Sequence, residues 1–264
     1  MSCSPTYEVF AVRYATRAER FRADNFIITD AHDVPMPIDF YIWVIRNQYR
    51  TIVVDTGFDH AEAERRGRKI TRLPREGLAL LGIDSHTVDD VIVSHLHYDH
   101  AGTLDDFPRA KFHIQDLEVN FATGRHMCEP TFRDFYSVNH VTRLIECVYQ
   151  DRVVFHDGDE VIAPGIMVHH LGGHTMGMQC VSVETKRGKI VLAVDAAHFY
   201  ATNHIEGVAC RQQGTTTGAG NIEKIDRDRR RRARHPIDTS LPNIIHATAG
   251  GFHPSRRAGA GINH

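Results

Sequence analysis

The chain has 264 residues, of which 42% are hydrophobic and 24% are charged, and its formal net charge is −2 with histidine neutral. This length can bury a sizeable core in one large domain or two packed halves, and the charge gives no overall bias toward nucleic acid or anionic membranes. The 19 histidines raise the expectation of a metal site, because histidine is the commonest metal ligand among side chains.

The first 115 residues alternate short apolar runs with turns, which predicts strands interrupted by two helices. Residues 46–50 separate two of the strands and predict a hairpin. The second helix has a proline in its first turn, where proline is tolerated. The predicted strands are 7–12, 40–45, 51–54, 91–93 and 110–115, and the predicted helices are 60–69 and 74–81.

Residues 116–150 are expected to be mostly helical and carry several aromatic side chains. The strand pattern then returns, with residues 184–188 as the turn of a second hairpin. Two strand-rich halves with helical stretches predict two sheets with helices packed outside them. The predicted strands of this half are 152–155, 161–162, 166–170, 179–183 and 189–194.

The composition changes after about residue 207, where the chain becomes polar, basic and glycine-rich. Few apolar residues recur there at a helical or strand period, so we expect a weakly specified tail. The predicted organisation is a domain over residues 1–206 and an atypical segment over 207–264 that can be poorly ordered. The exception is residues 241–246, which predict a short strand ending in His246.

A histidine-rich segment directly follows the predicted buried strand at 91–93. His95 and His97 alternate, so in an extended chain they share one face and can reach one metal. If the chain then enters a helix, Asp99 and His100 swing to a neighbouring position. Imidazole and carboxylate ligands suit zinc, with manganese, iron, cobalt and nickel as competitors. The alternative is a polar loop that is histidine-rich by coincidence.

Two further candidates also follow apolar strands. His174 lies in a Gly-Gly-His-Thr turn whose glycines allow close backbone approach. Asp195 ends the strand predicted at 189–194, where a carboxylate can bridge two ions. Ligands delivered from several strand ends into one cleft are typical of α/β sites.

These residues carry a resemblance that covers roughly residues 7–206. It rests on Asp55-Thr56-Gly57, on the His-x-His-x-Asp-His pattern at 95–100, on Gly173-His174-Thr175 and on Asp195-Ala196-Ala197. With these motifs the chain resembles the metallo-β-lactamase superfamily and, within it, the N-acyl homoserine lactonases. The resemblance implies a four-layer αββα sandwich with two divalent metal ions, usually zinc, in a cleft at one edge.

The resemblance also implies a role for each matching residue. Asp55 would support the site without binding metal, by orienting a ligand. The implied ligands are His95, His97 and His174 for the first metal, Asp99 and His100 for the second, and Asp195 as the bridge between them.

The chain departs from the lactonases in two places. A tyrosine often follows the bridging aspartate by three residues in that group, and His198 stands there, with Tyr200 two further on. His198 can polarise a carbonyl or donate a proton, or it can be a surface histidine. The group also has a late histidine at its second metal; His246 is the best candidate here and His253 the next.

The function expected from this resemblance is a lactonase. A metal-bound hydroxide would attack the carbonyl of an N-acyl homoserine lactone or a related lactone or ester. Asp99 would carry a proton to the leaving group, and His198 or Tyr200 would assist at the oxyanion.

Three other functions remain open. A thioesterase of the glyoxalase II type shares the first motif but usually has another histidine where Met178 stands. A non-catalytic or degenerate metal-binding protein would explain the unusual tail. A β-lactamase is disfavoured, because secretion would be expected.

The remaining features concern compartment and partners. The five cysteines show no C-x-x-C spacing, and the first residues lack a signal-peptide pattern, so we expect a cytoplasmic protein with free thiols. No apolar stretch is long enough for a membrane span. The arginine run at 229–234 is read as a solvated tail, not a nucleic-acid surface. The expected partner is a small-molecule substrate, and an oligomer is compatible with the sequence.

Overall fold

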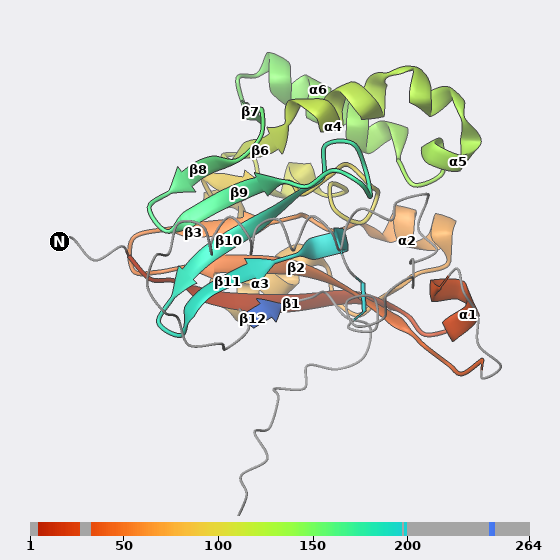
Figure 1. The fold of residues 1–264 in the computed structure, drawn as a ribbon, viewed down its shortest axis with the longest axis horizontal. Coiled ribbons are helices and arrows are strands. Elements are labelled where there is room, and N and C mark those ends of the chain that lie inside the picture. Colours follow the sequence, from red (N-terminus) through yellow and green to blue (C-terminus); the bar gives the residue numbers. More distant parts are fainter. Residues whose placement is uncertain (1–4, 27–32, 197, 200–242, 246–264) are drawn as a thin grey trace, which may run out of the picture.

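Two β-sheets stacked face to face form the centre of the computed structural model, which describes residues 5–26, 33–196, 198–199 and 243–245 (Figure 1). The main helix–sheet contacts of the described residues are made on the larger sheet. The two stacked sheets with helices outside agree with the αββα sandwich that the resemblance implies. No helix in the described part of the chain has the length and apolarity needed to cross a bilayer.

The larger sheet has seven strands in the order β4-β1-β2-β3-β5-β6-β7. Strands β1, β2 and β3 run antiparallel, with β2 and β3 joined by the predicted hairpin. Strands β3, β5, β6 and β7 run parallel. The bounds are β1 (Glu8–Arg17), β2 (Ile38–Arg46), β3 (Thr51–Val54), β4 (Lys69–Ile70), β5 (Asp90–Ile92), β6 (Lys111–Gln115) and β7 (Val153–His156).

The smaller sheet has five strands in the order β12-β11-β10-β9-β8. Its last strand comes from far along the sequence and pairs parallel to β11. The strand predicted at 241–246 is therefore confirmed for its central residues, while His246 lies outside the described residues. The bounds are β8 (Glu160–Ala163), β9 (Ile166–His170), β10 (Gln179–Thr185), β11 (Gly188–Leu192) and β12 (Asn243–Ile245).

Three helices contact strands of the larger sheet: α3 contacts β1, α4 contacts β6 and α6 contacts β7. The bounds are α1 (Arg22–Asn25), α2 (His60–Arg66), α3 (Pro74–Leu80), α4 (Asp116–Thr123), α5 (Pro130–Arg133) and α6 (Val138–Tyr149). Short 3₁₀ turns are η1 (Ser85–Thr87), η2 (Leu104–Asp106), η3 (Arg125–Cys128) and η4 (Val194–Ala196).

The helix predicted over 60–69 is shorter than expected. It ends at Arg66 because Gly67 adopts a left-handed conformation, with φ of 62°, and caps the last carbonyls of α2. The chain then reverses, and Lys69 and Ile70 form strand β4 against β1.

Both faces of the larger sheet are buried, which explains the near-continuous apolar character of its central strands. On β2, Trp43 and Ile45 pack between the two sheets, together with Val181 and Leu192 of the smaller sheet. The alternate residue Val44 packs on the opposite face, in the core beneath the helices. Period-two alternation thus divides one strand between two cores.

The strand directions bring four loops to one edge of the sandwich. Strands β3 and β5 are parallel, and β9 and β11 both run antiparallel to β10 and hence parallel to one another. The loops that follow these four strands contain Asp55, His95, His174 and Asp195. The chain segments that carry the candidate ligands therefore begin at the ends of the two sheets.

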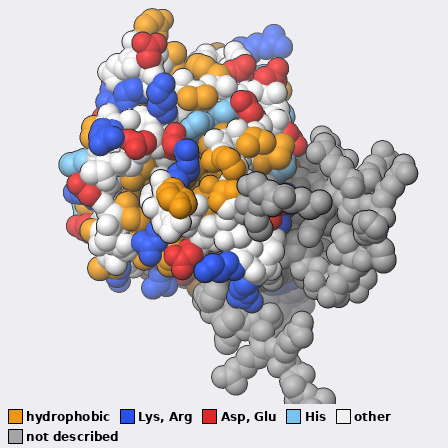
Figure 2. All heavy atoms as spheres, turned by 90° about the vertical axis from the view of Figure 1, so that its left-hand side faces the viewer, with side chains coloured by type: hydrophobic (Ala, Val, Ile, Leu, Met, Phe, Trp, Pro, Cys, Tyr) orange, Lys and Arg blue, Asp and Glu red, His pale blue; other side chains and the backbone are white. Residues whose placement is uncertain are grey.

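Charge on the surface is mixed in sign. Figure 2 shows Lys and Arg side chains interspersed with Asp and Glu side chains over the described part of the face that it presents. This distribution agrees with the net charge of −2.

Helix α3 offers a matched test of the core beneath the larger sheet. Leu78 is fully buried and Leu80 is 70% exposed on the same helix. We expect Leu78→Ala to lower the free energy of unfolding by about 2–5 kcal/mol, because it leaves a cavity. Leu80→Ala is expected to change it by less than about 0.5 kcal/mol. Urea unfolding measures both, and equal losses would contradict this assignment of the core.

Candidate metal centre

The histidine-rich segment leaves β5 as an extended chain and then turns. His97 forms an isolated bridge with Tyr136, and residues 98–100 form a turn in which the His100 amide donates to the His97 carbonyl. The chain therefore enters a turn after His97, and the helix that the sequence left as one possibility does not form there. Tyr14 holds this turn in place, because its hydroxyl donates a hydrogen bond of 2.8 Å to the backbone carbonyl of Asp99.

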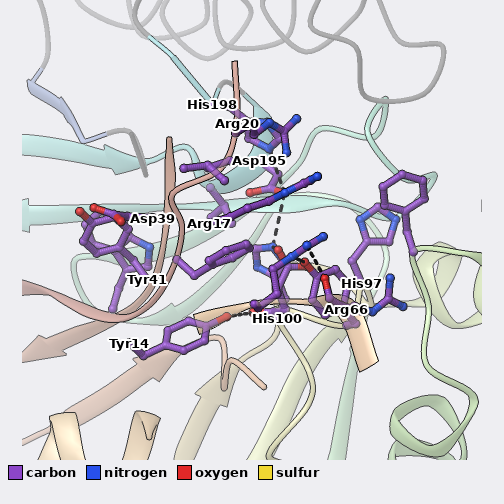
Figure 3. A pocket seen from close by; sticks show the side chains of 18 residues that line it. Tyr14, Arg17, Arg20, Asp39, Tyr41, Arg66, His97, His100, Asp195 and His198 are labelled. Carbon is purple, nitrogen blue, oxygen red and sulfur yellow. Dashed lines mark hydrogen bonds and ion pairs between the residues drawn. The ribbon is translucent and has the colours of Figure 1, made fainter. Parts of the chain in front are cut away.

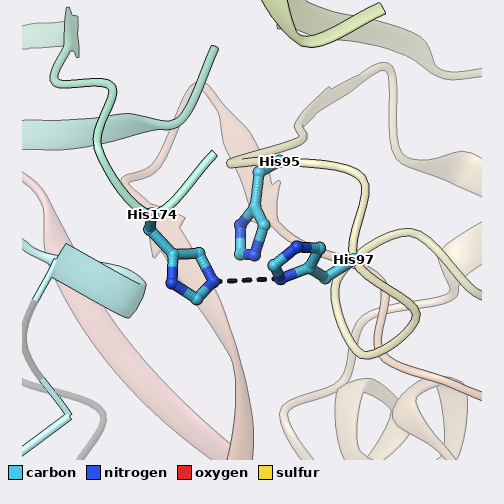
Figure 4. A group of neighbouring side chains, drawn as sticks. All are labelled: His95, His97 and His174. Carbon is cyan, nitrogen blue, oxygen red and sulfur yellow. Dashed lines mark hydrogen bonds between the residues drawn. The ribbon is translucent and has the colours of Figure 1, made fainter. Parts of the chain in front are cut away.

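The structure brings most of the predicted ligands together in two groups. One group is His95, His97 and His174, and the other is His95, His100 and Asp195; within each, the candidate ligand atoms lie within 4.8 Å of one another. Figure 4 shows the first three rings converging from two separate loops. The fold thus brings together residues that lie far apart in the sequence.

The hydrogen bonds around Ser94 fix the orientation of two of these rings. The Ser94 hydroxyl donates to Asp55 at 2.9 Å, so it can accept only from Nδ1 of His95, 3.0 Å away. The Nδ1 atom of His100 lies 2.8 Å from the carboxylate of Asp55. Both rings therefore carry a proton on Nδ1, and the Nε2 atom of each ring is turned toward the centre. Asp55 orients His100 as the resemblance implies.

The two free nitrogens are the observation that best fits a metal. His95 Nε2 and His100 Nε2 are buried and have no hydrogen-bond partner among the described residues. A buried polar atom without a partner is costly, and such atoms are rare in proteins. Both nitrogens lie near the same Asp195 oxygen, at 3.9 and 3.4 Å. The donor set of imidazoles plus carboxylate suits zinc.

Burial also holds the imidazoles in the neutral form that binds metals. It lowers the pKa of His95 and of His97 well below the usual value, and neighbouring imidazoles lower both further. Burial lowers the pKa of His174 to about 4. All three rings are therefore neutral near pH 7, so a metal ion has no proton to displace from them.

His100 lies in a different electrostatic environment. Burial lowers its pKa, but the surrounding carboxylates, first Asp195 and then Asp99, outweigh burial and raise it well above the usual value. The pKa of Asp195 is shifted in the opposite direction. Burial raises this pKa, but the nearby imidazoles of His198 and His100 outweigh burial and lower it well below the usual value. Asp99 lies 3.7 Å from His100 Nε2, outside both groups, and burial raises its pKa.

His198 lies beside Asp195, with its Nε2 3.1 Å from the carboxylate. Its side chain is buried, so the reading of His198 as a surface histidine is wrong. Tyr200, His246 and His253 lie outside the described residues.

The backbone is strained next to two carboxylates of the centre. Among the described residues other than glycine, positive φ occurs at Asp55 (64°), Val194 (47°) and one other position. A β-branched residue such as Val194 rarely adopts this conformation. Strained backbone of this kind concentrates at functional sites, and here it aims the Asp195 side chain.

A buried glutamate that sequence reading missed connects the two histidine loops. Glu118 on α4 accepts hydrogen bonds from the Leu96 amide at 2.8 Å, between His95 and His97, and from the Tyr136 hydroxyl at 3.1 Å. Its second oxygen accepts from the Thr175 hydroxyl and from the Gly177 amide, just after His174. One carboxylate therefore fixes the spacing between the loops. In the sequence it is only one acidic residue on a predicted helix.

Gly177 shows how closely the second loop approaches α4. A Cβ atom at this position would lie 2.0 Å from the Glu118 amide nitrogen. Only glycine allows this approach.

The candidate centre opens into a pocket of about 200 Å³. Figure 3 shows His97, His100, Asp195 and His198 around it. Aromatic side chains and arginines form the other walls, namely Tyr14, Phe40, Tyr41, Trp43, Tyr98, Phe135, Arg17, Arg20, Arg66 and Arg68.

Curated relatives of the chain are lactonases. An N-acyl homoserine lactonase from a Bacillus species is 24% identical over 189 residues, which are 66% of this chain and 69% of that protein. The N-acyl homoserine lactonase AiiB of Agrobacterium fabrum is 29% identical over 145 residues, 53% of this chain and 50% of its own length.

Solved structures support the fold. A quorum-quenching N-acyl homoserine lactone lactonase superposes with a TM-score of 0.69 at 19% identity, covering 92% of this chain and 93% of the other. AidC, a dizinc quorum-quenching lactonase, gives 0.59 at 16% identity, with 86% and 84% covered.

The family model described as the metallo-beta-lactamase superfamily matches residues 41–233. The match spans strands β2 to β11 and every candidate ligand that the structure describes. The chain therefore belongs to the metallo-β-lactamase superfamily of metal-dependent hydrolases.

Proposed function

We propose that this protein is a dinuclear lactonase that opens N-acyl homoserine lactones or related lactones. The observation that carries the proposal is the pair of buried, unpartnered nitrogens, His95 Nε2 and His100 Nε2, aimed at one carboxylate oxygen of Asp195. The substrate class follows from the names of the relatives, which are N-acyl homoserine lactonases.

The residues divide into two sets of ligands. His95, His97 and His174 would hold one ion, and His100, Asp99 and Asp195 would hold the other, with Asp195 shared. Bound divalent ions, which we take to be zinc, would supply a water nucleophile near neutral pH and positive charge for the carbonyl oxygen. The late ligand at His246 stays a prediction.

The protein itself supplies orientation and proton transfer. Asp55 and Ser94 hold the rings of His95 and His100. We assign Asp99 the transfer of a proton to the leaving alkoxide, the role that the family resemblance suggests. We assign His198 the task of orienting Asp195 and donating to the substrate carbonyl, a task that Tyr200 would share.

The pocket walls exclude water from the reacting groups. Phe40, Trp43 and Phe135 line the pocket beside the candidate centre. Apolar rings at this position suit the acyl chain of a lactone, and a drier site strengthens every electrostatic interaction inside it.

A thioesterase of the glyoxalase II type is the alternative enzyme. Met178, which stands where that group usually has a histidine, is fully buried in a small apolar cluster with Leu171 and Cys180. It packs as a core residue, so the alternative gains no ligand from this position.

Metal content and turnover together test the proposal. The purified chain is expected to contain about two zinc equivalents and to open N-hexanoyl homoserine lactone in a pH-stat assay. Dipicolinate treatment should abolish turnover, and added zinc should restore it. Faster turnover of S-lactoylglutathione would favour the thioesterase. Metal content near zero without turnover of either substrate would favour a degenerate protein.

The first ligand group is tested by His97→Ala. We expect a loss of about a thousandfold or more in kcat/KM and less bound zinc, because several kcal/mol of charge stabilisation depend on the metal. The control is His86→Ala, an exposed histidine beside Asp84. A His97→Ala protein that hydrolyses lactones at the original rate would rule out the proposed mechanism.

Glu118→Gln tests the connection between the loops. The Glu118 carboxylate accepts four hydrogen bonds, and the NH2 group of glutamine would face donors instead of accepting from them. We therefore expect a loss of about 1–3 kcal/mol in the free energy of unfolding. Zinc affinity should fall about tenfold, because the ligand loops lose their fixed spacing. Glu129→Gln, an exposed residue, is the control. Unchanged zinc affinity in Glu118→Gln would assign this carboxylate a purely structural role.

A further inference from the structure

Two arginines in the pocket stand on neighbouring strand ends. The antiparallel register of β1 and β4 pairs Ala15 with Ile70 and Thr16 with Lys69. Arg17 follows Thr16 and Arg68 precedes Lys69, so the two arginines flank this last pair, and both side chains line the pocket. Like charges on neighbouring strands destabilise their pairing.

Neither guanidinium is neutralised by a carboxylate of the described residues. The Arg17 side chain has no hydrogen bond or ion pair to any residue that the structure describes. Arg68 donates only to neutral oxygens, the Tyr98 hydroxyl at 3.1 Å and the Arg66 carbonyl. Both side chains are half-buried, so solvent does not fully compensate their charge.

The neighbouring charged groups are already engaged. Arg66 forms an ion pair with Glu62, which also pairs with Arg65. The Asp39 carboxylate at the pocket wall pairs with Arg13 at 3.1 Å. Among the described residues, no carboxylate pairs with the guanidinium groups of Arg17 and Arg68, whereas the neighbouring Arg66 is paired with Glu62.

A third donor in the pocket wall also has no partner. Trp43 is 2% exposed and lines the pocket, and its indole Nε1 makes no hydrogen bond to the described residues. The wall thus offers more hydrogen-bond donors than acceptors. A ligand rich in oxygen acceptors would satisfy this surplus.

We propose that Arg17 and Arg68 form an anion-binding pair that selects lactones carrying a carboxylate remote from the ring. The inference rests on the proposed lactonase function. Guanidinium groups match the planar carboxylate well. Phe40 and Phe135 in the same wall suit the carbon chain that would connect the carboxylate to the lactone. Figure 3 shows Arg17, Arg20 and Arg66 around the same space as His97 and Asp195.

Two substrates that differ only at the chain end test this selection. N-hexanoyl homoserine lactone ends in a methyl group, and N-adipoyl homoserine lactone ends in a carboxylate after the same four methylenes. The zinc-loaded protein is expected to prefer the adipoyl lactone by about tenfold or more in kcat/KM, mainly through KM. Arg17→Gln and Arg68→Gln should each reduce the ratio to within about twofold of one.

Arg109→Gln is the matched control, because Arg109 is exposed and paired with Asp89 away from the pocket. It should leave the ratio unchanged. A ratio near one in the unaltered protein that hydrolyses both lactones would overturn the inference and leave the proposed function standing.

A binding measurement separates the two proposals. Trp43 is the sole tryptophan, so its fluorescence reports on the pocket. Adipate should bind the protein stripped of zinc at least about tenfold more tightly than 1,6-hexanediol, which has a chain of the same length and no charge, and Arg17→Gln should remove the difference. Equal binding of both compounds overturns the inference. Arginine-dependent adipate binding without turnover of either lactone supports the anion pair and refutes the lactonase.

Discussion

Desolvation of the imidazole and carboxylate side chains at one edge of the sandwich sets the chemistry of this protein. Taking a histidine out of water favours its neutral form, and three of the four candidate histidine ligands are neutral for this reason. Taking an aspartate out of water is costly unless positive charge lies close by. Asp195 has several imidazoles around it and a pKa well below its usual value. The centre is therefore electrostatically prepared for cations before any ion arrives.

Sequence reading found most of the fold and most of this centre, because both depend on local patterns. Apolar alternation located the strands of both sheets, and strand ends located His95, His174 and Asp195. The conformation after His97 was left open by the sequence, because it depends on distant contacts. Tyr14 and Tyr136 hold that segment in a turn, and both come from distant parts of the chain.

The same reasoning explains the residues that sequence reading did not find. Glu118 acts through hydrogen bonds to residues about 20 and 60 positions away, and no local pattern distinguishes it from a solvated glutamate. Arg17 and Arg68 line one pocket only through the pairing of β1 with β4, and the sequence predicts the first residue of β4, Lys69, as the end of a helix. Where the role of a residue depends on tertiary contacts, the sequence shows which residue is present but not which residue it will contact.

The candidate ligands and the arginines of the pocket wall are positioned by different parts of the fold. The candidate ligands lie on loops fixed by strand ends and by Glu118, so their geometry is a property of the fold. The arginines lie on β1 and on the turn before β4, at the rim of the larger sheet, and neither belongs to a ligand loop, although Arg68 donates to the Tyr98 hydroxyl. A superfamily built in this way can keep one reaction centre while its walls accept different substrates.

The pairing of β12 with β11 gives the centre an order of assembly. Asp55 and His95 through His100 follow strands of the larger sheet, whose neighbours in the sheet all lie within the first 156 residues. Strand β11, which leads to Asp195, gains its second neighbour only when residues 243–245 return to it. Contacts between distant segments form slowly, and synthesis proceeds from the N-terminus. The histidines at 95–100 therefore follow a sheet whose strands are all synthesised within the first 156 residues, whereas the strand that leads to Asp195 acquires its second neighbour only from residues 243–245.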